Sequence, residues 1–281
     1  MSEAIEQLKA NLPTHPPVDS LKPLEEDYTG LRILAVHAHP DDESSKGAGT
    51  ASAYIARGAR FMVATMTGGE RGDILNEEIA KSPRAHRDLP GLRRAEMAAA
   101  REIMGIEHRW IGFFDSGLPE GDPMPPLPFG SFGTMPLDRA AAPLVRLVRE
   151  YRPHIIITYD EIGGYPHPDH IMTHKVAVEA FEKAGDPDAY VGEGEPWTPL
   201  KLYYDRAFNP ERTLTLHEHL LDTHGESLLS GWIENLAHRA SSGEAPRHET
   251  TTRILVTDHF EQRDQALRAH ASQVDPNGVF F

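Results

Sequence analysis

The sequence predicts an α/β protein with a Rossmann-like, doubly wound, mostly parallel sheet that has helices on both faces. Short apolar runs of strand length, rich in Val, Ile and Leu, alternate along the chain with longer helical patterns. Runs of this kind are typical of parallel strands that are buried on both faces. The chain of 281 residues is long enough for one large domain of this class or for two smaller ones.

The first half of the chain contains three predicted strands, separated by two predicted helices. Residues 31–36 (LRILAV) form the first apolar run, and a helix of small residues follows at 47–57. Residues 61–66 (FMVATM) form the second run. A helical pattern at 92–104 (LRRAEMAAAREIM) then leads into a third strand at 108–113.

The second half continues the alternation. Residues 137–151 form an amphipathic helix that Pro153 ends, and a fourth strand follows at 154–159 with three consecutive isoleucines. The remaining predicted elements are a helix at 169–184, a strand at 200–204, a mainly helical stretch at 211–239, a strand at 253–257 and a last helix at 259–271. Ligands of such sheets bind at the carboxyl ends of strands, where strand order reverses.

Two segments are predicted from these patterns. Residues 1–30 are polar and contain four prolines, so we read them as an N-terminal extension that has at most one short helix. Residues 31–281 are read as a single domain. The first residues lack a basic start followed by an apolar stretch, which is not the pattern of a secretory signal, so a cytoplasmic location is expected.

Composition limits the partners and the chemistry. The formal net charge is −15, from 43 acidic and 28 basic residues, and such a surface repels nucleic acid and anionic membranes. The longest apolar runs fall far short of a membrane span. Because the chain has no cysteine, any metal must be held by histidines and carboxylates.

Two polar clusters follow the first and fourth predicted strands. The first, residues 37–43 (HAHPDDE), places adjacent acids beside imidazoles, and a bound divalent cation is the simplest way to relieve the repulsion between the carboxylates. A solvated turn with a helix N-cap is the simpler alternative for either acid taken singly. The second, residues 159–170 (YDEIGGYPHPDH), combines two glycines that permit a sharp turn with two prolines that stiffen it.

Together the clusters predict a catalytic metal site with His39, Asp42 and His170 as ligands. Three protein ligands and one open position are typical of catalytic zinc. Asp41 is then a spare carboxylate beside the metal and the natural general base. His37 and His174 could be ligands, but we favour core or supporting roles for both. Three further histidines are expected on a helix surface: His217, His219 and His224.

The motifs AHPDDES at 38–44 and YPHPDH at 165–170 resemble the signature pair of the zinc-dependent N-acetylglucosaminyl deacetylase family (LmbE-like, PIG-L-like). The stretches TGGERGDILN, DSGLP and ALRAHASQVDPN extend the resemblance over about residues 31–281. Family members continue beyond the last residue of this chain, so a C-terminal segment is expected to be either removed or lacking here.

The resemblance implies roles for particular residues. His39, Asp42 and His170 would bind zinc, with ferrous iron as an alternative. Asp41 would accept a proton from the attacking water and later protonate the leaving amine. The other implied roles are oxyanion stabilisation by Tyr165 and His167, and substrate binding by Lys46, Asp73, Arg93 and Asp115. Asp73 stands where the family usually has Glu, and a plain helix-surface charge remains the alternative for Arg93.

The resemblance also implies a small-molecule substrate. The leading hypothesis is hydrolysis of the amide between glucosaminyl-inositol and an S-conjugated N-acetylcysteine, which releases a mercapturate. Lysine at position 46 occurs in the amidases of the family, where deacetylases carry a small polar residue. The alternatives are a deacetylase of N-acetylglucosaminyl-inositol and, from another class, a sugar or nucleotide binder without catalysis. No GxGxxG motif follows the first strand to support such a binder.

Overall fold

The computed structural model describes residues 3–11, 21–121, 123–206, 210–241, 248, 250–276, 278 and 281. The chain divides into two compact units. The larger unit comprises Leu24–Asp205 and Val256–Phe281, and the smaller comprises Met1–Pro23 and Arg206–Leu255. The predicted boundary at residue 31 stays a prediction.

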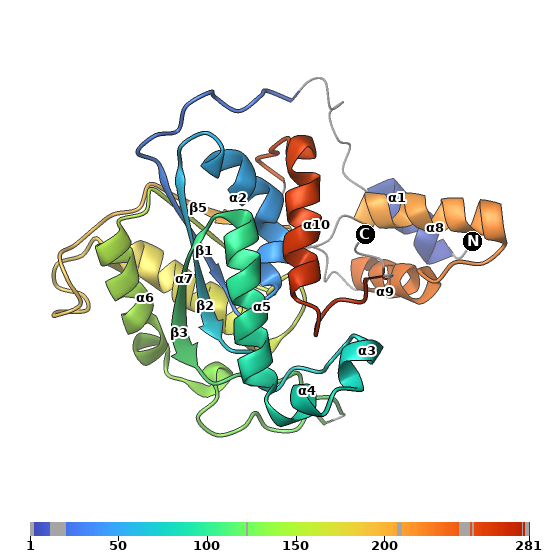
Figure 1. Ribbon diagram of the computed structural model, residues 1–281, viewed down its shortest axis with the longest axis horizontal. Coiled ribbons are helices and arrows are strands. Elements are labelled where there is room, and N and C mark those ends of the chain that lie inside the picture. Colours follow the sequence, from blue (N-terminus) through green and yellow to red (C-terminus); the bar gives the residue numbers. More distant parts are fainter. Residues whose placement is uncertain are drawn as a thin grey trace. The chain divides into compact units, whose positions relative to one another are not determined.

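The larger unit is built on a parallel sheet of five strands, in the order β3-β2-β1-β4-β5 (Figure 1). The strands are β1 (Arg32–His37), β2 (Arg60–Thr67), β3 (Glu107–Phe113), β4 (Ile155–Thr158) and β5 (Lys201–Tyr204). Every pairing is parallel, and β1 lies between β2 and β4. The strand order therefore reverses between β1 and β4, which brings the two polar clusters to the same edge of the sheet.

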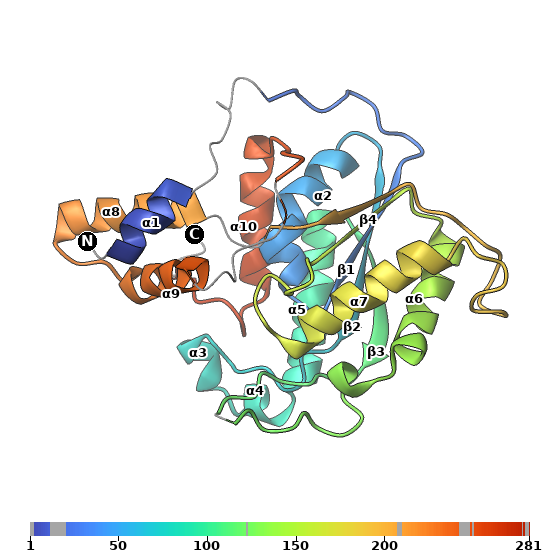
Figure 2. The same cartoon turned by 180° about the vertical axis from the view of Figure 1, so that it is seen from behind.

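Helices cover both faces of this sheet, which confirms the predicted doubly wound fold. One face is covered by α6 (Leu137–Tyr151) and α7 (Pro168–Lys183), and the other by α2 (Ala48–Ile55), α5 (Leu89–Met104) and α10 (Phe260–Ala269) (Figure 2). The short elements of this unit are η2 (Glu43–Gly47), α3 (Glu77–Ala80), α4 (Pro83–Arg87), η3 (Phe132–Thr134) and η4 (Thr257–His259).

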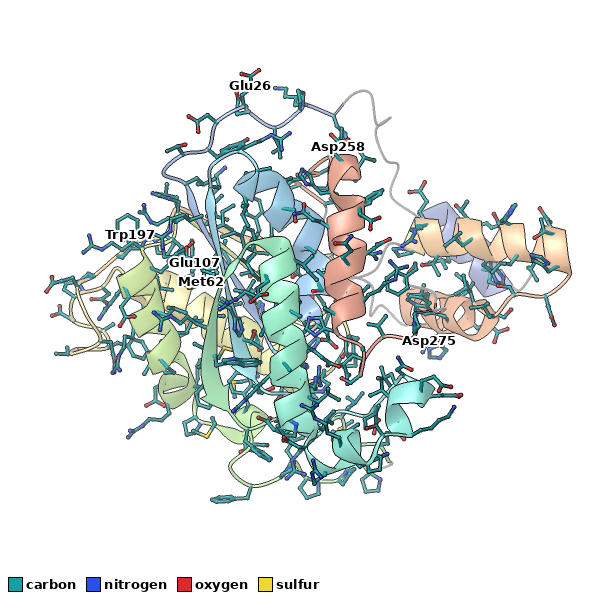
Figure 3. All side chains as sticks on the ribbon, viewed as in Figure 1. Glu26, Met62, Glu107, Trp197, Asp258 and Asp275 are labelled. Atoms are coloured by element: carbon teal, nitrogen blue, oxygen red, sulfur yellow. The ribbon has the colours of Figure 1, made fainter. Side chains whose placement is uncertain are left out.

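Two apolar cores lie on the opposite faces because successive strand residues alternate in direction. Leu34 and Val36 of β1 belong to the core under α6 and α7, whereas Ile33 and Ala35 belong to the core under α2, α5 and α10. Met62 of β2 pairs in register with Glu107 of β3 (Figure 3). The cores hold the sheet rigid beneath the edge that carries the polar clusters.

The strand predicted at 253–257 is wrong. Residues 251–256 have no regular structure, and η4 begins at Thr257. Apolar alternation makes a strand only where a neighbouring strand can pair, and none of the described strands pairs with these residues. Val256 instead packs so closely on α2 that a Cβ at Gly49 would lie 3.0 Å from its Cγ2.

The described residues of the smaller unit form three helices: α1 (Glu3–Asn11), α8 (Pro210–His224) and α9 (Ser230–Ser241). They enclose an apolar cluster formed by Ile5, Leu8, Leu214, Ile233 and Ala237. The start of the predicted extension is thus a helix packed in this cluster, while residues 12–20 of that extension lie outside the described residues. The prediction of a surface position is wrong for His217, which is buried with its Nδ1 2.9 Å from Ser227 Oγ, whereas His219 and His224 are exposed.

Among the described residues, no helix is both long and apolar enough to cross a membrane. The cytoplasmic location stays a prediction.

A single buried arginine, Arg149, binds the segment that follows α7, residues 184–194. The guanidinium of Arg149, on α6, is 4% exposed and forms no ion pair with a carboxylate among the described residues. It donates hydrogen bonds to five backbone carbonyl groups, those of Ala184, Asp186, Ala189, Tyr190 and Gly194. The dipoles of these peptide groups therefore stabilise the charge, and residues 184–194 depend on Arg149 for their hydrogen bonds.

We expect Arg149→Met to lower the free energy of unfolding by about 3 kcal/mol, because several buried carbonyls lose their donor at once. Urea unfolding followed by circular dichroism measures the change. Arg139→Met, on the exposed side of the same helix, is the control and should leave the midpoint almost unchanged. Equal midpoints for the two variants would contradict this role of Arg149.

Candidate metal and active site

The first polar cluster forms a tight turn between β1 and η2. The carboxylate of Asp42 accepts a hydrogen bond from the backbone N–H of His39, with 3.0 Å between nitrogen and Oδ2. Both side chains are buried. Burial alone would raise the pKa of Asp42, but the neighbouring cations, with Lys46 the strongest, hold it well below its usual range. Asp42 is therefore an ionised carboxylate fixed by its own turn, as a metal ligand would be.

The second cluster delivers His170 on the first turn of α7. Gly163 has a φ of 74°, and a Cβ at this position would lie 2.6 Å from the Cβ of His170. The Nδ1–H of His170 donates to the carbonyl oxygen of Gly163 at 2.9 Å. This bond places the lone pair on Nε2, which is buried and has no hydrogen-bond partner. Glycine is thus required for close packing as well as for the turn.

The structure brings the predicted ligands together. Nδ1 of His39 and Nε2 of His170 each lie 3.6 Å from Oδ2 of Asp42, and one ligand atom from each residue lies within 4.8 Å of the others. Two metal bonds of about 2.0–2.1 Å at a tetrahedral angle put their ligand atoms about 3.3 Å apart. A His/Asp/His metal site is therefore present at the junction of β1 and β4.

A second group, His39, Asp115 and His167, also meets the geometric requirement for a metal. The carboxylate of Asp115, like that of Asp42, already accepts hydrogen bonds through both of its oxygens. Both carboxylate oxygens of Asp115 accept backbone N–H groups, at 2.7 and 3.0 Å, and Nδ1 of His167 accepts the backbone N–H of Asp169. The unpartnered Nε2 of His170 favours the first group.

Two supporting residues escaped the sequence analysis. The hydroxyl of Tyr159 donates to Asp42 Oδ2 at 2.6 Å, and its ring stacks on His170 with 4.3 Å between centroids. Oδ2 of Asp169 lies 3.4 Å from Nε2 of His39. Partners of this kind orient metal ligands and fix the histidine tautomer. Both residues stand in the second cluster, residues 159–170, but sequence spacing alone does not reveal that they reach the predicted ligands.

Asp41 has the environment of a general base. It is adjacent to the ligand Asp42, its side chain is 26% exposed, and it lines the cavity over the metal site. Burial raises the pKa of its carboxyl group above the ordinary value, against the opposing charge of Arg93. Such a group can take up a proton and give it back.

Arg93 is buried, which excludes the surface-charge alternative. Its guanidinium donates to Asp41 Oδ2 at 3.2 Å, to the carbonyl oxygen of Pro40 at 2.6 Å and to that of Gly69 at 3.2 Å. These bonds hold Asp41, the candidate general base, and the loop after β2. Arg93 lines the cavity too, so its predicted contact with substrate stays a prediction.

Tyr165 and His167 present hydrogen-bond donors at the cavity. His167 accepts the Asp169 N–H through Nδ1 at 3.1 Å, so the proton of the neutral ring lies on Nε2. Burial and the neighbouring His39 lower the pKa of His167 to about 4, which keeps the ring neutral at pH 7. Burial and the nearby carboxylates raise the pKa of Tyr165, so its hydroxyl group keeps its proton.

The cavity above these groups has a volume of about 330 Å³. Of the predicted substrate-binding residues, Asp73, Arg93 and Asp115 line it. Lys46 lies outside this lining: its Nζ forms a short ion pair with Asp42 Oδ1 and sits 5.6 Å from the ring centroid of Tyr159. In this conformation Lys46 acts on a metal ligand, and a contact with substrate stays a prediction.

The two other candidate histidines lie outside the metal site. Nε2 of His37 is 2.8 Å from Asp205 Oδ2, and Nδ1 of His174 is 3.0 Å from the carbonyl oxygen of Tyr159.

Comparison with known proteins places this site in a family. Residues 34–181 match the PIG-L family, described as GlcNAc-PI de-N-acetylase. A mycothiol S-conjugate amidase from Streptomyces coelicolor is 51% identical over 253 residues, which cover 89% of this chain and 85% of that protein. The chain belongs to the PIG-L family.

Other members include a 1D-myo-inositol 2-acetamido-2-deoxy-alpha-D-glucopyranoside deacetylase from Streptomyces avermitilis. It is 36% identical over 261 residues, which cover 91% of this chain and 87% of that protein. The fold is shared with N,N'-diacetylchitobiose deacetylase from Pyrococcus horikoshii, with a TM-score of 0.59 at 17% identity over 86% of this chain and 70% of that one. This PIG-L family member is a hydrolase that acts on linear amide bonds.

Proposed function

We propose that this PIG-L family member hydrolyses the amide of mycothiol S-conjugates, releasing glucosaminyl-inositol and a mercapturic acid. The similarity carries most weight here: identity is 51% to an amidase named for that substrate and 36% to the deacetylase described above, over nearly the same share of the chain. The runner-up is deacetylation of N-acetylglucosaminyl-inositol. Both reactions break the bond between an acyl carbon and the amino-sugar nitrogen.

We propose zinc as the metal, with ferrous iron as the alternative, since two imidazoles and a carboxylate suit both ions. When bound, such a cation lowers the pKa of a coordinated water to about 7 and thereby supplies a nucleophile at neutral pH. His39, Asp42 and His170 would hold it. Their donor set and the unpartnered Nε2 of His170 support this assignment.

The chain's own side chains would then move the protons. Asp41 accepts the proton of the attacking water, and Arg93 keeps its carboxylate in place. As the carbonyl carbon becomes tetrahedral, the Tyr165 hydroxyl group and the Nε2–H of His167 donate to the oxyanion. A single well-placed donor of this kind is worth about 3–4 kcal/mol. Asp41 finally returns its proton to the leaving amine, and the C–N bond breaks.

The substrate is tested by steady-state assays of the zinc-loaded protein on two amides. We expect kcat/KM for a mycothiol S-conjugate to exceed that for the N-acetyl sugar by more than tenfold. Lys46→Ser is expected to narrow this ratio, and because Lys46 also pairs with Asp42, zinc content is measured on the same samples. A preference for the N-acetyl sugar would replace the amidase assignment with the deacetylase.

A further inference from the structure

A buried charge pair lies beside the candidate site but outside its cavity. Glu43, the residue after the ligand Asp42, pairs with His270 at the end of α10, with 2.7 Å between Oε1 and Nε2. The side chains are 1% and 0% exposed, and neither residue lines the cavity. The proposed reaction uses neither of them. Two charged groups removed from water so completely are costly unless their other atoms are also bonded.

The remaining oxygen of Glu43 reaches the general base. Oε2 accepts the backbone N–H of Asp41 at 2.9 Å, and Oε1 also accepts the Ser44 hydroxyl at 2.5 Å. Asp41 has a φ of 121°, a conformation that residues with a side chain rarely adopt. Such a backbone persists only where its surroundings hold it. The Glu43 carboxylate is one of those surroundings, and His270 fixes the carboxylate.

Asp41 also contacts α5, through its side chain. Arg93 bonds its carboxylate, and one helical turn later Glu96 accepts both the N–H and the hydroxyl of Ser272, each at 2.7 Å. Ser272 follows His270 by two residues. The contacts therefore close a ring from Asp41 through α5 to residues 270–272 and back through Glu43.

The same C-terminal segment supports the cavity wall. The side-chain amide of Gln273 donates to the carbonyl oxygen of Asp73 at 2.9 Å, and the N–H of Leu75 donates to the carbonyl oxygen of Ser272 at 2.9 Å. Asp73 and Leu75 both line the cavity. Residues 270–273 thus contact two parts of the site. They bond Glu43 and Glu96, which lie in the contacts around Asp41, and they bond Asp73 and Leu75, which line the cavity.

We propose that Glu43 and His270 are positioning residues, which keep the backbone of Asp41 in its left-handed conformation so that its carboxylate faces the attacking water. This inference rests on the proposed function for the catalytic role of Asp41. The backbone geometry of Asp41 does not depend on that function. A pair that served stability alone would lower the melting temperature when broken and leave turnover per folded molecule unchanged.

The test compares His270→Leu, which removes the donor, with His270→Gln, whose amide nitrogen can still donate to Glu43. Leu144→Ala, fully buried on α6, is the matched control for lost stability without contact with the site. We expect His270→Leu to lower kcat at least tenfold, with KM and zinc affinity within about twofold. His270→Gln should recover kcat to within about threefold, and Leu144→Ala should melt earlier at unchanged kcat.

A crystal structure of His270→Leu gives a readout that is independent of activity. We expect the φ of Asp41 to leave the left-handed region. An unchanged φ, or an unchanged kcat, overturns the positioning role. If His270→Leu does not fold, His270→Asn replaces it, because its shorter side chain does not reach Glu43. Failure of the wild-type protein to cleave the thiol conjugate overturns the proposed substrate instead, and the φ readout still decides the present proposal.

Discussion

Replacing Asp41 by Asn is expected to lower kcat by about 10³-fold while zinc binding and the unfolding midpoint stay near their wild-type values. Asn cannot take up the proton of the attacking water or deliver one to the leaving amine, and general acid–base catalysis contributes about 10²–10⁴-fold. Among residues with a side chain, Asn is also one that tolerates a positive φ well, and φ is 121° here. The amide can still accept the Arg93 hydrogen bond, so the loop should keep its shape.

The measurement is single-turnover hydrolysis of the preferred amide, with zinc content determined on the same samples. The control is Asp258→Asn, the same change of side chain at an exposed position on η4. Residual activity of Asp41→Asn within about tenfold of wild type would show that another group moves the proton.

Removing a candidate metal ligand should lower zinc affinity more than the Asp41→Asn substitution does. We expect His170→Ala to weaken zinc affinity by well over 100-fold, because losing even an outer hydrogen-bond partner of a ligand typically costs 10–100-fold. Activity should fall by more than 10³-fold at equal total zinc and recover in part as zinc is raised. His170 is wholly buried and its Nε2 has no hydrogen-bond partner, so the substitution removes one of the three ligand atoms outright.

Competition titration with a chromogenic chelator measures this affinity. His174→Ala is the matched control, one helical turn along α7, since His174 bonds only the carbonyl oxygen of Tyr159 among the contacts described. Its zinc affinity should change by about tenfold at most. Similar losses in the two variants would mean that α7 as a whole, and not the imidazole of residue 170, determines binding.

The three candidate metal ligands could be predicted because strand position and residue type were enough to identify them. Clusters at the ends of β1 and β4 had to meet once the sheet was parallel and its order reversed between those strands. Residue types then selected His39, Asp42 and His170 by ligand chemistry. Asp41 followed as the acid left over.

Contacts between distant residues could not be predicted in this way. The pairing of Glu43 with His270 spans 227 residues, and only the packing of α10 against α2 and α5 brings them together. The contact made by Lys46 could not be predicted for a different reason. Its place after the first strand was clear from the sequence, but the direction of its side chain depends on the buried carboxylate of Asp42. Residues 253–257 do not form the expected strand because no described strand pairs with them. The sequence of one segment does not show whether a pairing partner exists.

The central claim is that one cation is held jointly by the ends of β1 and β4. The most direct measurement is anomalous diffraction at the zinc absorption edge from crystals of the zinc-loaded protein. We expect one strong peak at about 2.0–2.2 Å from His39, Asp42 and His170 together. A peak held by His39, Asp115 and His167 instead, or zinc bound without His170, would contradict it.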